Sequence, residues 1–303
     1  MEQINRLNSY YKNKFGCKIY KLSLNGGMTC PNRDGTLGTN GCIFCSRGGS
    51  GDFASHSSLS IPEQIEEAKK LVSRKISDGK YIAYFQAYTN TYADVFYLKK
   101  IYYDAIAPDD IAGISIATRP DCLNEDVIEL LDEINHIKPV YIELGLQTIH
   151  KESAQFIRRG YDLSVFEKAI ASLFAINVNI VVHLIIGLPH ESKEMILESI
   201  KYLNQFPIHG VKLQLLHILK NTDLADYYEQ TNFPVLSLEE YTEIIAACIE
   251  HLRSDIVIHR MTGDGNKREL TAPLWSADKK RVLNYMNKYF SEHNIVQGRE
   301  VWQ

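Results

Sequence analysis

The sequence predicts an α/β protein built on parallel strands. Short apolar runs rich in β-branched residues alternate along the chain with segments whose apolar residues recur every three or four positions. Alternation of this kind implies parallel strands that are joined by right-handed helical crossovers. Six such units can form either a curved, incomplete barrel or an open, doubly wound sheet.

Each predicted element follows from its own stretch of sequence. The predicted strands cover residues 19–25, 81–87, 113–118, 140–146, 179–187 and 210–219. The predicted helices between them cover residues 62–76, 93–106, 124–135, 164–176 and 191–206. Ser164 and Ser192 stand near the starts of the last two helices, where a side-chain oxygen can accept a backbone hydrogen bond.

The pattern changes after residue 235. Two predicted helices, 238–252 and 276–290, flank one short strand over 255–261. We therefore expect a barrel over residues 15–235 and a small α/β appendage over residues 236–303 that packs on it.

The composition is that of a soluble protein. Of the 303 residues, 45% are hydrophobic and 23% are charged, which allows a sizeable core. The net charge of -4 argues against a general nucleic-acid coat or a binder of anionic membranes, although a local basic patch remains compatible with it. The amino terminus lacks the apolar run of a signal peptide, and no stretch is apolar enough to span a membrane. We expect a cytoplasmic protein whose reduced cysteines serve metal binding or catalysis.

Three of the six cysteines lie on one turn-rich loop after the first predicted strand, CPNRDGTLGTNGCIFC (30–45). Cys42 and Cys45 have the spacing at which one tight turn presents two thiolates to one metal centre. The glycines and asparagines between them and Cys30 allow that residue to fold back. In a barrel of parallel strands this loop lies at the carboxyl ends of the strands, where active sites gather.

The three thiols allow two kinds of metal centre. Structural zinc takes four protein ligands, and Cys17 or His56 would be the nearest fourth. A 4Fe–4S cluster that is held by three thiolates leaves one iron open to a small molecule. The ligand set alone does not decide between these metals. Phe44, on the same loop, is either a core aromatic or a flat apolar face beside a cofactor. Cys122 and Cys248 are expected to be packed thiols.

The sequence as a whole resembles the radical-SAM superfamily, whose members bind a 4Fe–4S cluster on a partial (β/α)6 barrel similar to a TIM barrel. Eleven residues separate the first two cysteines, and the words TRPDCL, ELGLQT, RRGYDLSVF and HLIIGLPHES follow in order. These features are similar to the radical-SAM half of the Elongator catalytic subunit and to bacterial relatives, over about residues 15–290. The resemblance implies that the open iron binds S-adenosylmethionine and that its cleavage gives a 5′-deoxyadenosyl radical.

The resemblance also implies which residues meet the cofactors. Cys30, Cys42 and Cys45 match the cluster ligands. The positions that match cofactor-binding segments are Phe44, Gln86, Tyr88, Thr118, Glu143, Gln147, Arg159 and His183.

Some of these positions depart from the family pattern or have other readings. Residues 86–89 replace a Gly-Gly-Glu segment, and Ala117 stands where many relatives have a glutamate. Considered alone, Glu143 must find a partner inside its apolar strand. Arg159 also fits a helix end, and His183 also fits a satisfied core histidine.

The substrate is inferred from the polar segment VIHRMTGDGNKRELTAPLW (257–275), near the carboxyl end of the barrel series. His259, Arg260, Lys267 and Arg268 are candidates for binding phosphate, and the aromatic residues are candidates for stacking bases. A charged surface loop is the alternative. The resemblance implies tRNA, at carbon 5 of the wobble uridine in the anticodon stem-loop. Because no acetyltransferase domain follows, we expect a radical step on an existing side chain, from carboxymethylaminomethyluridine to aminomethyluridine.

Three classes of function follow from these observations. We favour a radical-SAM enzyme that modifies tRNA over one that acts on a small molecule or a protein. A zinc-stabilised binding module is the third class. Either enzyme requires an electron donor such as flavodoxin or ferredoxin, and no membrane partner is expected.

Overall fold

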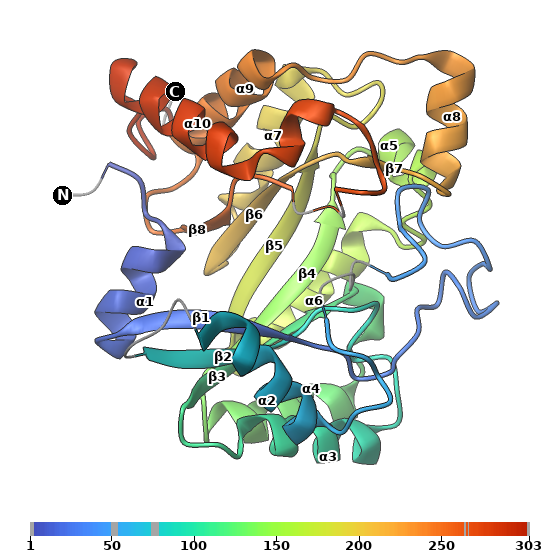
Figure 1. Ribbon diagram of the computed structural model, residues 1–303, viewed down its shortest axis with the longest axis vertical. Coiled ribbons are helices and arrows are strands. Elements are labelled where there is room, and N and C mark those ends of the chain that lie inside the picture. Colours follow the sequence, from blue (N-terminus) through green and yellow to red (C-terminus); the bar gives the residue numbers. More distant parts are fainter. Residues whose placement is uncertain (1–2, 50–53, 74–78, 264, 266, 302–303) are drawn as a thin grey trace.

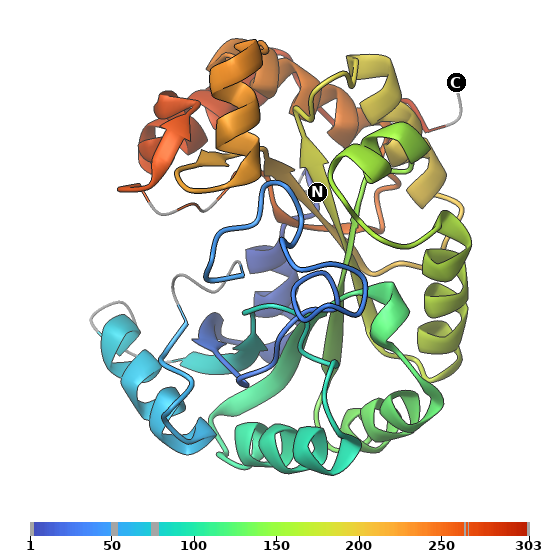
Figure 2. The ribbon, with the colours of Figure 1, turned by 90° about the vertical axis from the view of Figure 1, so that its right-hand side faces the viewer.

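The computed structural model describes residues 3–49, 54–73, 79–263, 265 and 267–301. Its centre is a seven-stranded parallel sheet that curls into an open half-barrel with helices on the outside (Figures 1 and 2). In spatial order the strands are β1 (Lys18–Leu24), β2 (Gly79–Phe85), β3 (Ile111–Thr118), β4 (Val140–Gln147), β5 (Asn179–Ile186), β6 (Gly210–Leu215) and β8 (Val257–Arg260). The curl confirms the incomplete barrel and not the doubly wound sheet.

Helices cover the outer face of the sheet (Figure 2). They are α2 (Ile61–Val72), α3 (Val95–Ile106), α4 (Glu125–Asn135), α6 (Leu163–Ala175), α7 (Lys193–Leu203) and α9 (Leu238–His251). Ser192 caps α7 as predicted, because its hydroxyl accepts a hydrogen bond from the backbone of Met195. The residue before α6 is Asp162, so Ser164 lies inside that helix. The end of the predicted helix over 62–76 lies outside the described residues.

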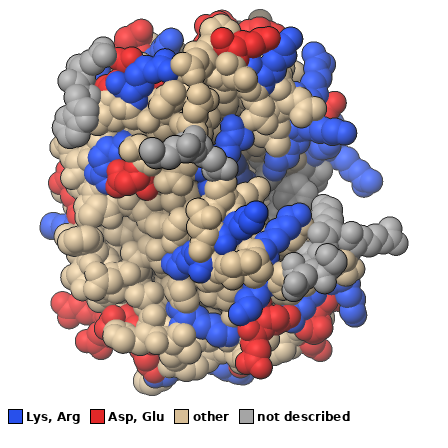
Figure 3. Space-filling model, turned by 90° about the vertical axis from the view of Figure 1, so that its left-hand side faces the viewer, with Lys and Arg blue, Asp and Glu red and all other residues tan. Residues whose placement is uncertain are grey.

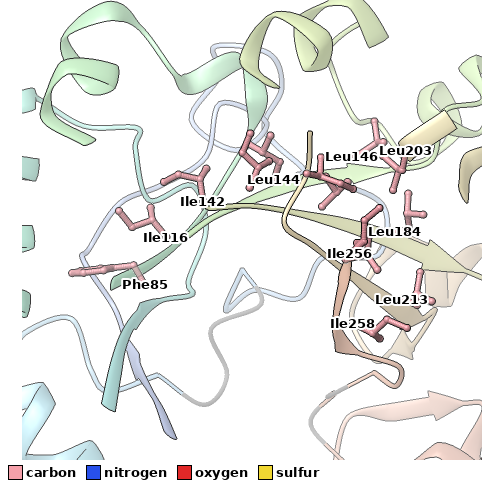
Figure 4. Packing of buried hydrophobic residues seen from close by; sticks show 14 of the residues in the cluster. Phe85, Ile116, Ile142, Leu144, Leu146, Leu184, Leu203, Leu213, Ile256 and Ile258 are labelled. Atoms are coloured by element: carbon pink, nitrogen blue, oxygen red, sulfur yellow. The ribbon is translucent and has the colours of Figure 1, made fainter. Parts of the chain in front are cut away.

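Alternation along the strands gives the sheet two different faces. The side chains on the outward face are apolar and pack under the helices in one continuous core, as do Phe85, Ile116, Ile142, Leu144, Leu184 and Leu213 (Figure 4). The inward face carries polar side chains on most strands, namely Lys21, Tyr84, Ser115, Glu143, His183 and Lys212. The interior of the half-barrel is therefore polar. The apolar side chains on the outward face form a continuous layer between the sheet and the helices, which we call the apolar wall.

A helix that the sequence analysis did not predict, α1 (Leu7–Phe15), closes the amino-terminal end of the half-barrel. Its Tyr11 is buried against Ile19, Tyr141 and Val181 in a small cluster of its own. Figure 3 views the molecule from the side on which α1 lies, and many Lys and Arg side chains lie across the middle of that side. The pocket described below is lined instead by residues at and after the carboxyl ends of the strands.

The C-terminal segment is built into the sheet as well as packed on it. β8 pairs with β6 as the seventh strand. The predicted strand over 210–219 is interrupted, so that β7 (Ile218–Leu219) pairs instead with β9 (Leu270–Ala272) in a separate antiparallel ladder. α10 (Lys279–Glu292) buries Val282, Met286 and Phe290.

Two further helices lie near the carboxyl ends of the strands and were not predicted. They are the short α5 (Lys151–Phe156) and α8 (Asp223–Thr231). No helix in the described parts of the chain is both long and apolar enough to cross a membrane.

We expect burial of the apolar wall to contribute most to the free energy of unfolding. Leu144→Ala removes a side chain that is 0% exposed on β4, and we expect it to lower the free energy of unfolding by about 2–5 kcal/mol through lost burial and an unfilled cavity. Leu71→Ala is the matched control, since Leu71 on α2 is 78% exposed and should be nearly neutral. Urea unfolding followed by circular dichroism measures both, and equal losses would contradict this account.

Candidate active site

The loop after β1 carries the three cysteines to the open end of the half-barrel (Figure 2), where Cys30, Cys42 and Cys45 line one pocket. Two tight turns shape the loop: the backbone N–H of Arg33 donates to the Cys30 carbonyl at 2.8 Å, and that of Cys45 donates to the Cys42 carbonyl at 3.0 Å. The side-chain amide of Asn32 lies 3.4 Å from the Cys42 sulfur. These contacts fix the direction in which the thiols face.

The segment RRGYD, which follows α5, holds the cysteine loop in place. The Asn32 amide donates to the Arg158 carbonyl at 2.6 Å, and the Ile43 N–H donates to the Ile157 carbonyl at 3.3 Å. Gly160 has a φ of +84°, and a Cβ there would lie only 2.9 Å from the Asn32 side-chain oxygen. A glycine is therefore required for this close approach.

The position of the other candidate ligands decides between the two predicted metal centres. Cys17 precedes β1 and packs in the cluster around Tyr11, at the closed end of the barrel. The seven residues of β1, at about 3.3 Å each, place it roughly 20 Å from the cysteine loop. His56 does not line the pocket, and its Nδ1 lies 2.8 Å from the Ser58 hydroxyl. The closed zinc site with either residue is therefore excluded.

Three thiols without a protein fourth ligand fit a 4Fe–4S cluster with one open iron. Among the described residues, no three His, Cys, Asp or Glu side chains are gathered as ligands of a single ion. In a cluster, by contrast, each thiolate binds a different iron of one cube. The cysteines meet this need because all three face one pocket that is open on its other side.

Two arginines place positive charge beside the thiols. Burial lowers the pKa of Arg33, but the neighbouring Cys45, Tyr88 and Cys30 together outweigh it and raise that pKa. Arg119 lies near Cys30 and Cys42. Its guanidinium donates two hydrogen bonds to the Asp121 carboxylate, at 2.9 Å and 2.7 Å. Burial raises the pKa of Cys42 to about 11, so we expect this thiol to be deprotonated only when metal replaces its proton.

The pocket has a volume of about 250 Å³ and gathers most of the residues that the sequence predicted. Those are Cys30, Cys42, Cys45, Phe44, Gln86, Tyr88, Thr118, Glu143, Gln147, Arg159, His183 and Arg260. Tyr88 and Gln147 lie at the carboxyl ends of β2 and β4 with φ values of 59° and 69°. A non-glycine residue rarely adopts this conformation, and such residues cluster at binding sites.

The other three predicted residues do not line the pocket. Both ring nitrogens of His259 are buried, and its ring centre lies 5.6 Å from that of His209 and 6.5 Å from that of Tyr141. Contrary to our prediction, a phosphate group has no access to it, because its strand turns this side chain toward the closed end. Lys267 and Arg268 are exposed beyond the pocket.

The floor of the pocket is a buried carboxylate with its partners. Glu143 accepts hydrogen bonds from Lys21 at 2.5 Å, from the Ser115 hydroxyl at 2.7 Å and from the His183 ring at 2.9 Å. It also pairs with Lys212. The burial of Glu143 would raise its pKa, but the two ammonium groups hold that pKa well below its usual range. Burial lowers the pKa of His183 to about 4 and that of Lys212 to about 7.

Glu143 and Arg159 therefore have protein partners in addition to facing the pocket. The Arg159 guanidinium donates to the carbonyl of Thr148 at 2.6 Å and to that of Tyr161 at 3.0 Å. Contact of either residue with a cofactor stays a prediction.

Lys21 and Lys212 were not predicted as site residues, although the sequence carries a signal for both. Each is a lysine inside an apolar strand, IYKLSL and GVKLQL. A charge in that position must be partnered, which is the argument that singled out Glu143.

The chain is similar to known proteins over nearly its whole length. Residues 35–203 match the family model of the radical SAM superfamily, and residues 208–292 match that of the radical SAM C-terminal domain. An uncharacterized protein of Bacillus subtilis, YtqA, is 40% identical over 97% of this chain and 91% of its own length.

Two further similarities are more distant. The tRNA uridine(34) acetyltransferase of Methanocaldococcus jannaschii is 27% identical over 62% of this chain and 35% of its own length. The structure of the archaeal Methanocaldococcus infernus Elp3 superposes with a TM-score of 0.71 over 92% of this chain and 64% of that one, at 17% identity. At that identity the superposition shows the shared fold alone.

We expect each of Cys30→Ala, Cys42→Ala and Cys45→Ala to abolish cluster binding, because each thiolate holds its own iron. Wild-type protein that is reconstituted without oxygen should carry about four irons and four sulfides per chain. Cys122→Ala is the matched control, since Cys122 is close enough to Cys30 for the two charges to interact. Iron and sulfide analysis measures all four variants, and loss of the cluster in the control would show a fourth thiol ligand.

The carboxylate of Glu143 should matter for stability as well as for the site. Glu143→Gln leaves two ammonium groups without their anion, so we expect a loss of about 3–5 kcal/mol in the free energy of unfolding. Because the folded-state pKa of Glu143 lies below its ordinary value, the carboxylate stabilises the fold above that ordinary value. This contribution is lost as the pH falls through the folded-state pKa. Unfolding by urea at several pH values should show a smaller acid-induced loss in the variant. If the stability of Glu143→Gln depended on pH as that of the wild-type protein does, this role would be contradicted. Glu133→Gln, which changes a surface ion pair, is the control.

Proposed function

Because the chain belongs to the radical SAM superfamily, we propose that it is an enzyme that modifies the carbon-5 side chain of the wobble uridine in tRNA. Its cofactors are a 4Fe–4S cluster and S-adenosylmethionine, which together supply a 5′-deoxyadenosyl radical. The reaction proposed is the conversion of carboxymethylaminomethyluridine to aminomethyluridine.

The observation that carries this proposal is the charge of the pocket. The described residues that line it include five Lys or Arg side chains and one Glu, although the net charge of the chain is -4. Positive charge thus exceeds negative charge around the pocket that the cofactor and the substrate must share, which favours anionic groups on these ligands. The similarity to an enzyme named for uridine 34 of tRNA supports the choice of nucleoside.

The chemistry of the proposed side chain suits hydrogen abstraction. Its terminal methylene lies between an amine nitrogen and a carboxylate, and both groups stabilise a radical on that carbon. Loss of one hydrogen atom, and then of one electron to an acceptor of the iron–sulfur class, forms a C=N bond. Water cleaves this bond, so the nitrogen stays on the nucleoside as aminomethyluridine and the two-carbon unit leaves as glyoxylate.

The chain's own residues then divide the remaining tasks. We propose that Cys30, Cys42 and Cys45 hold the cluster and that the pocket positions Phe44, Gln86, Tyr88, Thr118, Gln147 and Arg159 face S-adenosylmethionine. Lys267 and Arg268, which are exposed outside the pocket, are proposed to contact tRNA phosphates. A flavodoxin or ferredoxin is proposed as the electron donor.

Reduced enzyme, S-adenosylmethionine and tRNA that carries carboxymethylaminomethyluridine test the proposal directly. We expect that nucleoside to disappear, with one aminomethyluridine and one glyoxylate formed for each 5′-deoxyadenosine, as measured by mass spectrometry. Cys45→Ala is the control and should form none of the three. Formation of 5′-deoxyadenosine with unchanged nucleosides would overturn the tRNA proposal and direct the search to a small molecule or a protein.

A further inference from the structure

The cations of the pocket fall into two groups. Near the cysteines, Arg33 donates to the backbone carbonyls of Cys45 and Ser46, at 3.0 Å and 2.7 Å, and Arg119 pairs with Asp121. Arg159 is held by backbone carbonyls as well. These three guanidinium groups therefore already have hydrogen-bond acceptors from the protein around the cysteine loop.

The floor of the pocket has an excess of positive charge. Lys21 and Lys212 share one carboxylate, that of Glu143. His183 adds no negative charge, and Arg260 stands beside Lys212, since the two residues are register partners on β6 and β8 and both line the pocket. Like charges on neighbouring strands repel each other. One further anion would balance the two ammonium groups, which share only the carboxylate of Glu143.

Lys212 is placed to contact such an anion. Its side chain is only 5% exposed, yet it lines the pocket. An ammonium group has three N–H donors, and the structure gives that of Lys212 two acceptors, the Glu143 carboxylate and the Tyr84 hydroxyl at 3.2 Å. A third acceptor on a ligand would complete its hydrogen bonds in a place where water is largely excluded.

We propose that Lys212, with Arg260 beside it, binds the carboxylate of the substrate and so selects an acidic side chain on the nucleoside. This inference rests on the proposed function, and it adds the group by which the substrate is recognised. A carboxylate fits better than a phosphate because the site lies at the floor of a pocket of about 250 Å³, where an RNA backbone does not reach. A carboxylate at the end of a single flexible side chain does reach it.

The test compares two anticodon stem-loop RNAs that differ at one group. One carries carboxymethylaminomethyluridine, and the other carries its carboxamide, which has nearly the same shape without the charge. Wild-type protein should bind the acid more tightly than the amide by about tenfold to a hundredfold, the effect of one hydrogen-bonded charge. The binding is measured without S-adenosylmethionine, so that the carboxylate of the cofactor cannot contribute.

In Lys212→Met the ratio of the two affinities should fall to about one, whereas Lys212→Arg should keep part of the preference. Iron content after reconstitution reports whether each variant is folded. Arg260→Met is the second test if Lys212→Met does not fold, and it should lower the same ratio. Lys267→Glu combined with Arg268→Glu is the control: it should weaken the binding of both RNAs equally and leave the ratio unchanged.

The outcomes separate the two proposals. Equal binding of acid and amide by the wild-type protein overturns the carboxylate site. So does a Lys212→Met variant that loses affinity for S-adenosylmethionine but keeps the ratio, because Lys212 would then serve the cofactor. A wild-type protein that prefers the acid but does not convert it leaves the carboxylate site in place and overturns the proposed reaction.

Discussion

The carboxylate of Glu143 is the interaction on which the interior of this protein depends. Through Lys21, Ser115, His183 and Lys212 it connects β4 to β1, β3, β5 and β6. Two ammonium groups inside a half-barrel would each bear a large desolvation cost, and one buried anion between them is what makes the arrangement stable. The polar inner face is possible because this charge network lies behind a continuous apolar wall.

The same network forms one part of the pocket, and the cysteine loop forms another. The cysteine loop, the residues that follow β2 and the end of β4, and Glu143, His183 and Lys212 of the charged floor all line one pocket. Asn32 and Gly160 join the loop to the segment after α5, so the thiols are positioned by the barrel and not by the loop alone. We propose that Cys30, Cys42 and Cys45 would hold the cluster and that Lys212 would hold a substrate group in this same pocket. This arrangement is what hydrogen abstraction requires, because the radical and the target carbon must be brought together away from water.

The sequence was sufficient to place the strands and the loop that carries the three cysteines, for physical reasons. A strand that is buried on its outer face and partly polar on its inner face still reads as an apolar run, so β1 to β6 were placed to within a few residues. The cysteine loop was recognisable as a metal site because two thiols stand at the spacing of one tight turn and turn residues let the third fold back toward them. The helix α1 was missed although Leu7, Tyr11 and Phe15 recur every four residues, because its polar remainder resembles an ordinary amino terminus. His259 was misplaced because a sequence does not show toward which end of the barrel a side chain on an inner face points. The excess charge of the floor depends on which strands meet, and Lys21 and Lys212 come together only in the folded sheet.

The central claim is that three cysteines hold a 4Fe–4S cluster with one open iron that faces the pocket. Electron paramagnetic resonance of the reduced, reconstituted protein measures this iron before and after S-adenosylmethionine is added. The account predicts a 4Fe–4S signal whose g-values shift on addition of the cofactor, with hyperfine coupling to nitrogen when the methionine amino group carries 15N. A spectrum that S-adenosylmethionine leaves unchanged, with no coupling to the labelled nitrogen, would contradict it.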